Sequence, residues 1–185
     1  MAKNGLILLT PTSISYTGTG ATINPNGSVS FTSVGEVILN GVFSADYRNY
    51  RVVYNGRTTA SNYDSLDVRV ASGGTKNTSN YYYQIIYGDS SGRAATKASN
   101  VGRIYMGLLN LNAHGGGHFD VYDPYVNRTT VMNGVSANNW NNRGYIWDNS
   151  SYHYDTSLFD GISLGTSQGT GRPMTGMVAV YGMRD

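Results

Sequence analysis

Turn-forming sequences recur about every ten residues along this chain, and they limit its fold more than any other feature. They are NPNG at 24–27, NG at 40–41 and 55–56, SGG at 72–74, GDSSG at 88–92, HGGG at 114–117, DP at 123–124, NG at 133–134 and GTSQGTGRP at 165–173. The runs between them alternate apolar and polar residues, as strands with one buried face do. No stretch of 12 residues has the 3.6-residue period of a helix. We therefore predict an all-β chain that forms an antiparallel β-sandwich of the jelly-roll type.

Two runs show which side chains should share a face of a strand. In SLDVRVAS, the leucine and both valines fall on one face, and Asp67 and Arg69 fall on the other. The run NYYYQ holds three consecutive tyrosines. Because side chains alternate along a strand, Tyr81 and Tyr83 should point one way and Tyr82 the other. No single surface can then display all three rings.

The composition favours strands over helices. Charged residues make up 13% of the 185 residues and Glu36 is the one glutamate, whereas exposed helices need many charged and long polar side chains. The 16 tyrosines, against four phenylalanines, supply rings with an apolar body and a polar tip. The length suits one domain.

Charge and cysteine content exclude several classes of partner. The formal net charge is +2, and the lysines and arginines are scattered, so we expect no nucleic-acid partner. A chain without cysteine has no disulfides and no thiolate metal ligands. The apolar run LILL near the N-terminus is too short for a signal peptide or a membrane span, so we expect no export signal and no membrane partner.

The N-terminal segment differs from the rest of the chain. Residues 1–34 are rich in Thr, Ser, Gly and Asn, and Lys3 is their one charged residue. Such a segment is either an extended arm that docks on a neighbour or the first strands of the sandwich. The remaining residues, 35–185, form the β-sandwich domain in both interpretations.

Two motifs resemble catalytic or metal-binding sequences. GTSQG matches the nucleophile elbow G-x-S-x-G with Ser167 as nucleophile, but the following QGTGRPM cannot begin a stable helix, so we interpret it as a loop. HGGGHFD offers His114, His118 and Asp120 as metal ligands. Three glycines between the histidines leave them without a rigid support, so we interpret this stretch as a loop between strands.

Acid–base catalysis by carboxylates is the remaining enzymatic possibility. A glycosidase needs two acids fixed across a cleft. The candidates are Asp120, Asp123, Asp148, Asp155 and Asp160, most of them beside Gly, Asn or Pro, where a carboxylate caps the backbone of a turn. We therefore expect no catalytic residues, no metal, no cofactor and no enzymatic activity.

Aromatic and amide side chains gather in residues 137–155. The aromatic residues of this stretch are Trp140, Tyr145, Trp147, Tyr152 and Tyr154. A sugar ring stacks its CH face on such a ring while amides bind its hydroxyl groups, so the stretch is a candidate for glycan contact. Trp and Tyr are also enriched at protein interfaces, so a contact with a protein partner or a core position is the alternative.

Three stretches together carry a resemblance to a known family. They are EVILNGVFSADYRNYRVVYNG at 36–56, LDVRVASGGTKNTSNYYYQ at 66–84 and TGMVAVYGMR at 175–184. In these the chain resembles small virion structural proteins of tailed bacteriophages, which have a jelly-roll or concanavalin-like sandwich and occur as head decoration proteins and as tail or fibre components. The resemblance covers about residues 36–111 and the last ten residues. It brings no catalytic motif.

The resemblance implies a non-enzymatic virion structural protein, first of all a head decoration (cement) protein that binds and stabilises the capsid surface after assembly in the host cytoplasm. Its partners would be further copies of itself in a homotrimer and the major capsid protein. The N-terminal arm would then contact the capsid through Leu6, Ile7, Leu8 and Leu9. The alternative is a tail fibre or receptor-binding domain that recognises host surface polysaccharide.

Overall fold

The computed structural model describes residues 5–59, 63–111, 113–140 and 143–184, with the side chains of Trp140, Arg143 and Thr170 also outside the description. The strands are β1 (Leu6–Leu9), β2 (Ser13–Ile23), β3 (Val29–Asn40), β4 (Asn49–Thr58), β5 (Tyr63–Ser72), β6 (Thr75–Lys76), β7 (Tyr81–Asp89), β8 (Gly92–Val101), β9 (Ile104–Asn110), β10 (Gly115–Tyr122), β11 (Thr130–Trp140), β12 (Arg143–His153), β13 (Gly161–Thr166) and β14 (Met174–Met183). A single 3₁₀ turn, η1 (Gly169–Gly171), precedes β14. These ranges contain no α-helix, and hence no helix that is long and apolar enough to cross a membrane.

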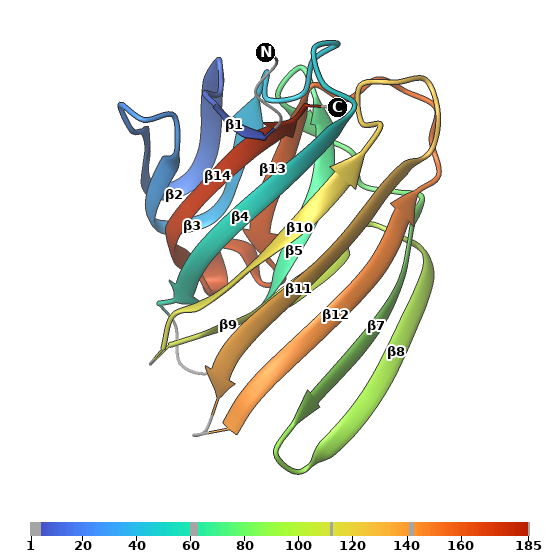
Figure 1. The fold of residues 1–185 in the computed structure, drawn as a ribbon. Coiled ribbons are helices and arrows are strands. Elements are labelled where there is room, and N and C mark those ends of the chain that lie inside the picture. Colours follow the sequence, from blue (N-terminus) through green and yellow to red (C-terminus); the bar gives the residue numbers. More distant parts are fainter. Residues whose placement is uncertain (1–4, 60–62, 112, 141–142, 185) are drawn as a thin grey trace.

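All strands belong to one antiparallel sheet, which curls strongly into a half-barrel (Figure 1). Its main path runs β6-β5-β13-β3-β14-β4-β10-β11-β12-β7-β8, with β1 on β14, β2 on β3 and β9 on β5. The prediction of an all-β antiparallel chain is confirmed. The long hairpins β7–β8 and β11–β12 project past the other strands at one end of the sheet (Figure 1).

Strand β3 turns the corner of the curl. Its first half pairs with β14 and its second half with β13, while β2 runs along its whole length. The backbone of Ser33, at the junction, has a positive φ of 48°. Gly18 of β2, which pairs with the next residue Val34, has a φ of 117°, and a side chain there would strike the backbone of Ser33. Only glycine tolerates both this φ and this close approach, so Gly18 is the residue that permits the bend here.

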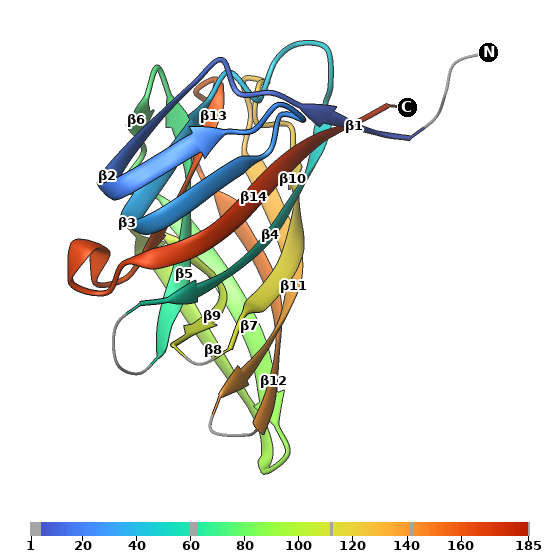
Figure 2. The same ribbon diagram turned by 90° about the vertical axis from the view of Figure 1, so that its left-hand side faces the viewer.

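The N-terminal segment lies in the sheet. Strand β1 pairs with the last residues of β14, from Leu6 opposite Met183 to Leu9 opposite Val180. Figure 2 shows β1 beside the end of β14 and β2 beside β3. Leu9 packs against the core, whereas Leu6 is 47% exposed. The proposed capsid contact of this run stays a prediction.

The core fills the inside of the curl. The strands from β14 to β7 turn one face inward, and β13, β5 and β9 cover much of that face. The largest fully buried side chains are Tyr50, Tyr81, Phe43, Phe119, Leu39, Leu66, Ile85, Ile104, Leu109, Met132, Ile162 and Leu164. Their burial removes apolar surface from water along the whole length of the curl and is the main force that closes it.

Side chains of the opposite strands fix β9 inside the curl. One edge of β9 pairs with β5. On its other side, Asn138 Nδ2 donates to the carbonyl of Leu108 (2.8 Å), and Asn149 Nδ2 donates to the carbonyl of Tyr105 (2.8 Å). The hydroxyl of Tyr54 donates to a third carbonyl of β9, that of Met106, at 3.0 Å. Buried carbonyls without a sheet partner are thereby satisfied.

The three consecutive tyrosines divide as predicted. Tyr81 is fully buried and Tyr83 is nearly so, both on the inner face of β7. Tyr82 points outward and stacks on Tyr152 of β12, with ring centroids 4.9 Å apart and planes at 4°. The neighbouring buried His153 packs between aromatic rings, and burial lowers the pKa of its imidazole.

Replacing Gly107 by alanine should destabilise the fold. A Cβ at Gly107 would lie 2.5 Å from Ser136 Oγ and 2.6 Å from the Tyr54 hydroxyl, which already holds β9. We expect Gly107→Ala to lower the free energy of unfolding by about 1–3 kcal/mol. Urea-induced unfolding followed by circular dichroism measures this change. Gly20→Ala is the matched control, because a Cβ there meets nothing within 4 Å. Equal urea midpoints for the two variants would contradict the close packing of β9.

Candidate functional site

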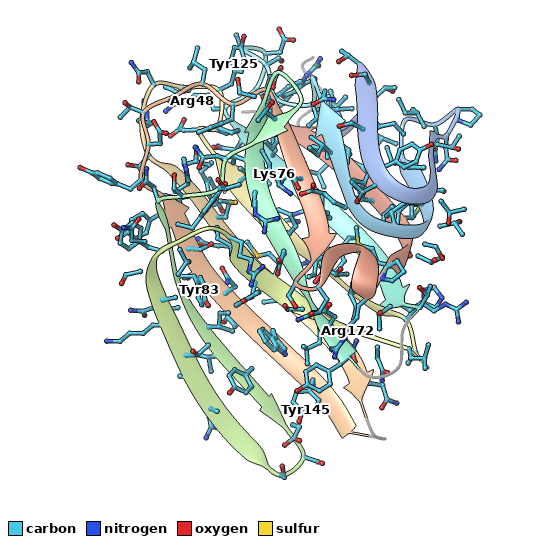
Figure 3. All side chains as sticks on the ribbon, turned by 180° about the vertical axis from the view of Figure 1, so that it is seen from behind. Arg48, Lys76, Tyr83, Tyr125, Tyr145 and Arg172 are labelled. Atoms are coloured by element: carbon cyan, nitrogen blue, oxygen red, sulfur yellow. The ribbon has the colours of Figure 1, made fainter. Side chains whose placement is uncertain are left out.

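A cleft of about 460 Å³ opens between two walls of the curl. One wall is the inner face of β7, β8 and β12. The other consists of the start of β5, part of β9, and the segment from Ser167 to Arg172. Figure 3 shows Tyr83 and Tyr145 on the β7–β12 side and Arg172 on the opposite side, near the η1 turn. The projecting hairpins extend beyond the strands that cover the core, and this difference in length leaves the cleft open.

Aromatic rings line the cleft on both sides. Trp147 lies directly opposite Tyr87 in the pairing of β12 with β7, and their rings stack with centroids 5.2 Å apart and planes at 22°. Tyr145 stands two residues before Trp147 and therefore on the same face of β12. Tyr83 meets Tyr105 of β9 edge to face, at 5.6 Å between centroids. Flat, partly exposed rings with polar tips suit a ligand that has both apolar faces and hydroxyl groups.

The polar end of the cleft is built around Asp64. This buried carboxylate accepts hydrogen bonds from the hydroxyl of Ser167, from the backbone N–H of Gln168 (3.2 Å) and from the backbone N–H of Ser65 (2.8 Å). Arg172 Nη1 donates to the carbonyl of Tyr63 at 2.9 Å. These bonds attach the segment after β13 to β5 and fix the shape of the second wall.

A buried acid stands next to this wall. The side chain of Asp67 is fully buried, with Arg103 Nη1 at 3.2 Å and Arg69 Nη2 at 3.5 Å from its Oδ2. Burial raises the pKa of Asp67 to about 6, although the two arginines act in the opposite direction and Asp64 adds to the rise. Asp67 lies on the polar face of β5, as the alternation of residues indicates, but this face is buried at Asp67 and not exposed to solvent.

The five aromatic residues singled out in the sequence do not form one group. Tyr145 and Trp147 line the cleft. Tyr152 is on the outer face of β12, because it is an odd number of residues from Trp147, and Tyr154 lies beyond the strand, 67% exposed. Trp140 ends β11, and its side chain lies outside the described residues.

Of the residues that line the cleft, the sequence identified Tyr145 and Trp147 as candidate ligand contacts and missed the others. Tyr83 and Tyr87 carried a usable signal, because they are four residues apart on one strand and share its inner face. No such signal existed for Tyr105, Asp64 and Arg172. The pairing of β9 with β5 and the position of the η1 turn bring these residues to the cleft.

In the structure, the residues of GTSQG and HGGGHFD make contacts other than those of a catalytic or metal site. Ser167 follows β13 and donates to Asp64, and a 3₁₀ turn rather than a helix comes after it. HGGGHFD is not the loop that the sequence predicts, because Gly115–Tyr122 form β10. In this strand Asp120 forms two hydrogen bonds with Arg51, at 2.7 and 2.8 Å. Within the described ranges, no three His, Asp or Glu side chains are placed to hold a metal ion.

The four other candidate acids are turn or surface groups. Asp155 accepts from the backbone N–H and the hydroxyl of Ser157, which lowers its pKa. Asp123 pairs with Arg48 at 2.8 Å, and Asp160 accepts from the backbone N–H of Gly73 at 3.0 Å. Asp148 is exposed on the outer side of β12. None of these four lines the cleft.

Asp67 should make stability depend on pH in a predictable direction. Its pKa is about 6 in the folded chain against the ordinary aspartate value of 3.8 in the unfolded chain, so between these values the folded state binds more protons. Its contribution to the free energy of unfolding therefore grows as pH falls through 6 and is lost as pH rises through it. The lowered pKa of His153 acts in the opposite direction but is common to wild type and an Asp67 variant.

The measurement compares the wild type with Asp67→Asn by urea unfolding at pH 7.5 and 5.0. On going to the lower pH, the wild type should gain about 1 kcal/mol relative to the variant. The same pH dependence in both proteins would show that Asp67 is not buried as an ionisable group in the folded chain.

Comparison of the chain with protein-family models gives no match, and comparison with curated proteins gives none. Function is therefore inferred from the residues of the cleft and their chemistry.

Proposed function

We propose that this protein is a non-enzymatic bacteriophage virion component that recognises cell-surface polysaccharide through the cleft between β7–β12 and β5–β9. The stacked pair of Tyr87 and Trp147 on the wall of the open cleft is the observation that carries this proposal. In such a protein this activity would belong to a tail fibre or receptor-binding component, the alternative that the resemblance to phage virion proteins leaves open.

The size and lining of the cleft support saccharide as the ligand. Its volume of about 460 Å³ falls within the range of small-molecule sites, about 300–1,000 Å³. A sugar ring presents CH groups on one face, which stack on aromatic rings, and hydroxyl groups around its edge. The tyrosine hydroxyls and the polar groups of Ser65, Ser167 and Arg172 line the same space. Such groups can exchange hydrogen bonds with the edge of the ring.

The acids near the cleft support binding rather than hydrolysis. A glycosidase needs two carboxyl groups facing the scissile bond. Among the described residues that line the cleft, Asp64 is the one acid, and its carboxylate already accepts three hydrogen bonds that fix the cleft wall. Asp67 lies behind the wall with two arginines.

A head decoration protein is the second candidate, and the outer face of the sheet favours it. Ile86 and Ile146 are 60% and 64% exposed on neighbouring strands, and Val135 of β11 is 43% exposed. Exposed apolar side chains in one region suit contact with a capsid protein or with further copies in a homotrimer. The curl of the sheet, with β13, β5 and β9 over its inner face, supports the jelly-roll sandwich of both candidates.

Labelling this protein on intact phage particles distinguishes the two candidates. The label would cover the whole capsid surface if the protein were a head decoration protein, and only the tail if it were a receptor-binding component.

Removing the indole of Trp147 should weaken saccharide binding. We expect Trp147→Ala to weaken binding to the best ligand of a bacterial-glycan array by about tenfold or more, since a stacked ring contributes about 1 kcal/mol or more beyond its buried area. Isothermal titration calorimetry measures the loss. Tyr152→Ala is the matched control, because Tyr152 stacks on Tyr82 on the outer face.

Three results would contradict the proposal. One is a flat array with folded protein, a second is equal loss of binding in both variants, and the third is release of reducing ends from the bound glycan. The last result would make the protein an enzyme.

A further inference from the structure

A second hollow continues the cleft on the side of the buried acid. It has a volume of about 400 Å³ and shares Tyr83 and Tyr105 with the cleft. Two arginines, Arg69 and Arg103, contribute to its lining. Because the two spaces share two of their rings, a ligand longer than one sugar unit can occupy both.

Arg103 is held in position and still presents part of its guanidinium to the hollow. Its Nε donates to the hydroxyl of Tyr105 at 3.2 Å, and its Nη1 lies 3.2 Å from Asp67. These contacts use part of the five N–H donors of a guanidinium. The side chain is 34% exposed, whereas that of Arg69 is 12% exposed and donates to the carbonyl of Gly102. Arg103 is therefore the more accessible of the two cations.

The charges around the hollow leave a positive surface. The described residues that line the hollow include Arg69 and Arg103 and no acid, whereas Asp67 and Glu36 pair with these cations from outside the lining. The side chain of Asp67 is fully buried, whereas that of Arg103 is 34% exposed. An approaching ligand therefore meets the guanidinium of Arg103 before the carboxylate of Asp67.

We propose that the ligand is an acidic saccharide, whose carboxylate or sulfate group binds Arg103 in this hollow while a neighbouring sugar ring stacks on Trp147 and Tyr87. This inference rests on the proposed saccharide-binding function of the cleft. The planar guanidinium matches the two oxygens of a carboxylate or sulfate and forms charge-assisted hydrogen bonds with them. Asp67 is a positioning residue, because it orients the guanidinium of Arg103 from behind.

The test uses a glycan array of matched pairs. Each uronate-containing or sulfated oligosaccharide is printed beside its carboxyl-reduced or desulfated counterpart of the same length and linkage. We expect wild-type protein to bind acidic members about tenfold or more better than their neutral counterparts, with affinity that falls as salt rises. Arg103→Gln should remove this preference, and Arg103→Lys, which keeps the charge without the planar fork, should keep part of it.

Lys97→Gln is the charge-matched control. Lys97 is exposed on the outer face of β8, opposite Gln84, so its removal changes the net charge equally without touching the hollow. We expect it to leave the preference unchanged, and thermal unfolding checks that each variant is folded.

The outcomes separate this inference from the function on which it rests. Equal binding of acidic and neutral members, lost in Trp147→Ala, would overturn the acidic ligand and leave saccharide recognition standing. A preference that Lys97→Gln reduces as much as Arg103→Gln would also overturn it, because general attraction would then explain it. Binding to no member of any pair would overturn both.

Discussion

The hydrogen bonds that hold β9 inside the curled sheet are the constraint on which the rest of the structure depends. Among the described residues, strand β9 has a sheet partner on one side only, and a strand edge with unsatisfied carbonyls inside a core would be costly. The amides of Asn138 and Asn149 and the hydroxyl of Tyr54 supply the missing donors. These polar side chains make it possible for β9 to lie against β11 and β12. Through β9, they also set where Tyr105 stands.

The cleft follows from this arrangement. Where β9 and β5 cover the inner face of the sheet, the core is closed. Beyond them, the hairpins of β7–β8 and β11–β12 continue without a covering layer, and stacked aromatic rings take the place of core contacts. The stacking of Trp147 on Tyr87 keeps the rings in place before a ligand arrives, which lowers the entropy lost on binding. A rigid, aromatic and partly open surface of this kind suits sugar rings.

The charges add a second property to the same surface. Asp67 costs free energy as a buried carboxylate, and Arg69 and Arg103 offset part of that cost. The same ion pair fixes the guanidinium of Arg103 beside Tyr105, at the boundary between the cleft and the hollow. The buried acid thus has a structural role in presenting a cation.

The alternation of apolar and polar residues predicted the antiparallel all-β architecture and the opposite directions of Tyr82 and its two neighbours, because both depend on local periodicity. Three of the expected turns were wrong, since 55–56 lies within β4, 115–117 within β10 and 133–134 within β11. The same parity separates Tyr152 from Trp147, although the sequence reasoning grouped them. The remaining features depend on contacts between distant segments. The burial of Asp67 and the approach of Tyr105 to Tyr83 follow from the pairing of β5 with β9 and the position of β9 in the curl. No local pattern encodes these contacts.

The central claim is that ligand binds on the inner face, at Trp147. The chain has two tryptophans, so two indole N–H resonances are expected in a ¹⁵N NMR spectrum, and Trp147→Phe assigns one of them. Titration with the tightest-binding oligosaccharide of the array should shift the Trp147 resonance until it saturates, together with backbone amides of β7, β9 and β12. An unmoved Trp147 resonance, with shifts gathered around Tyr82 and Tyr152 on the outer face, would contradict the account.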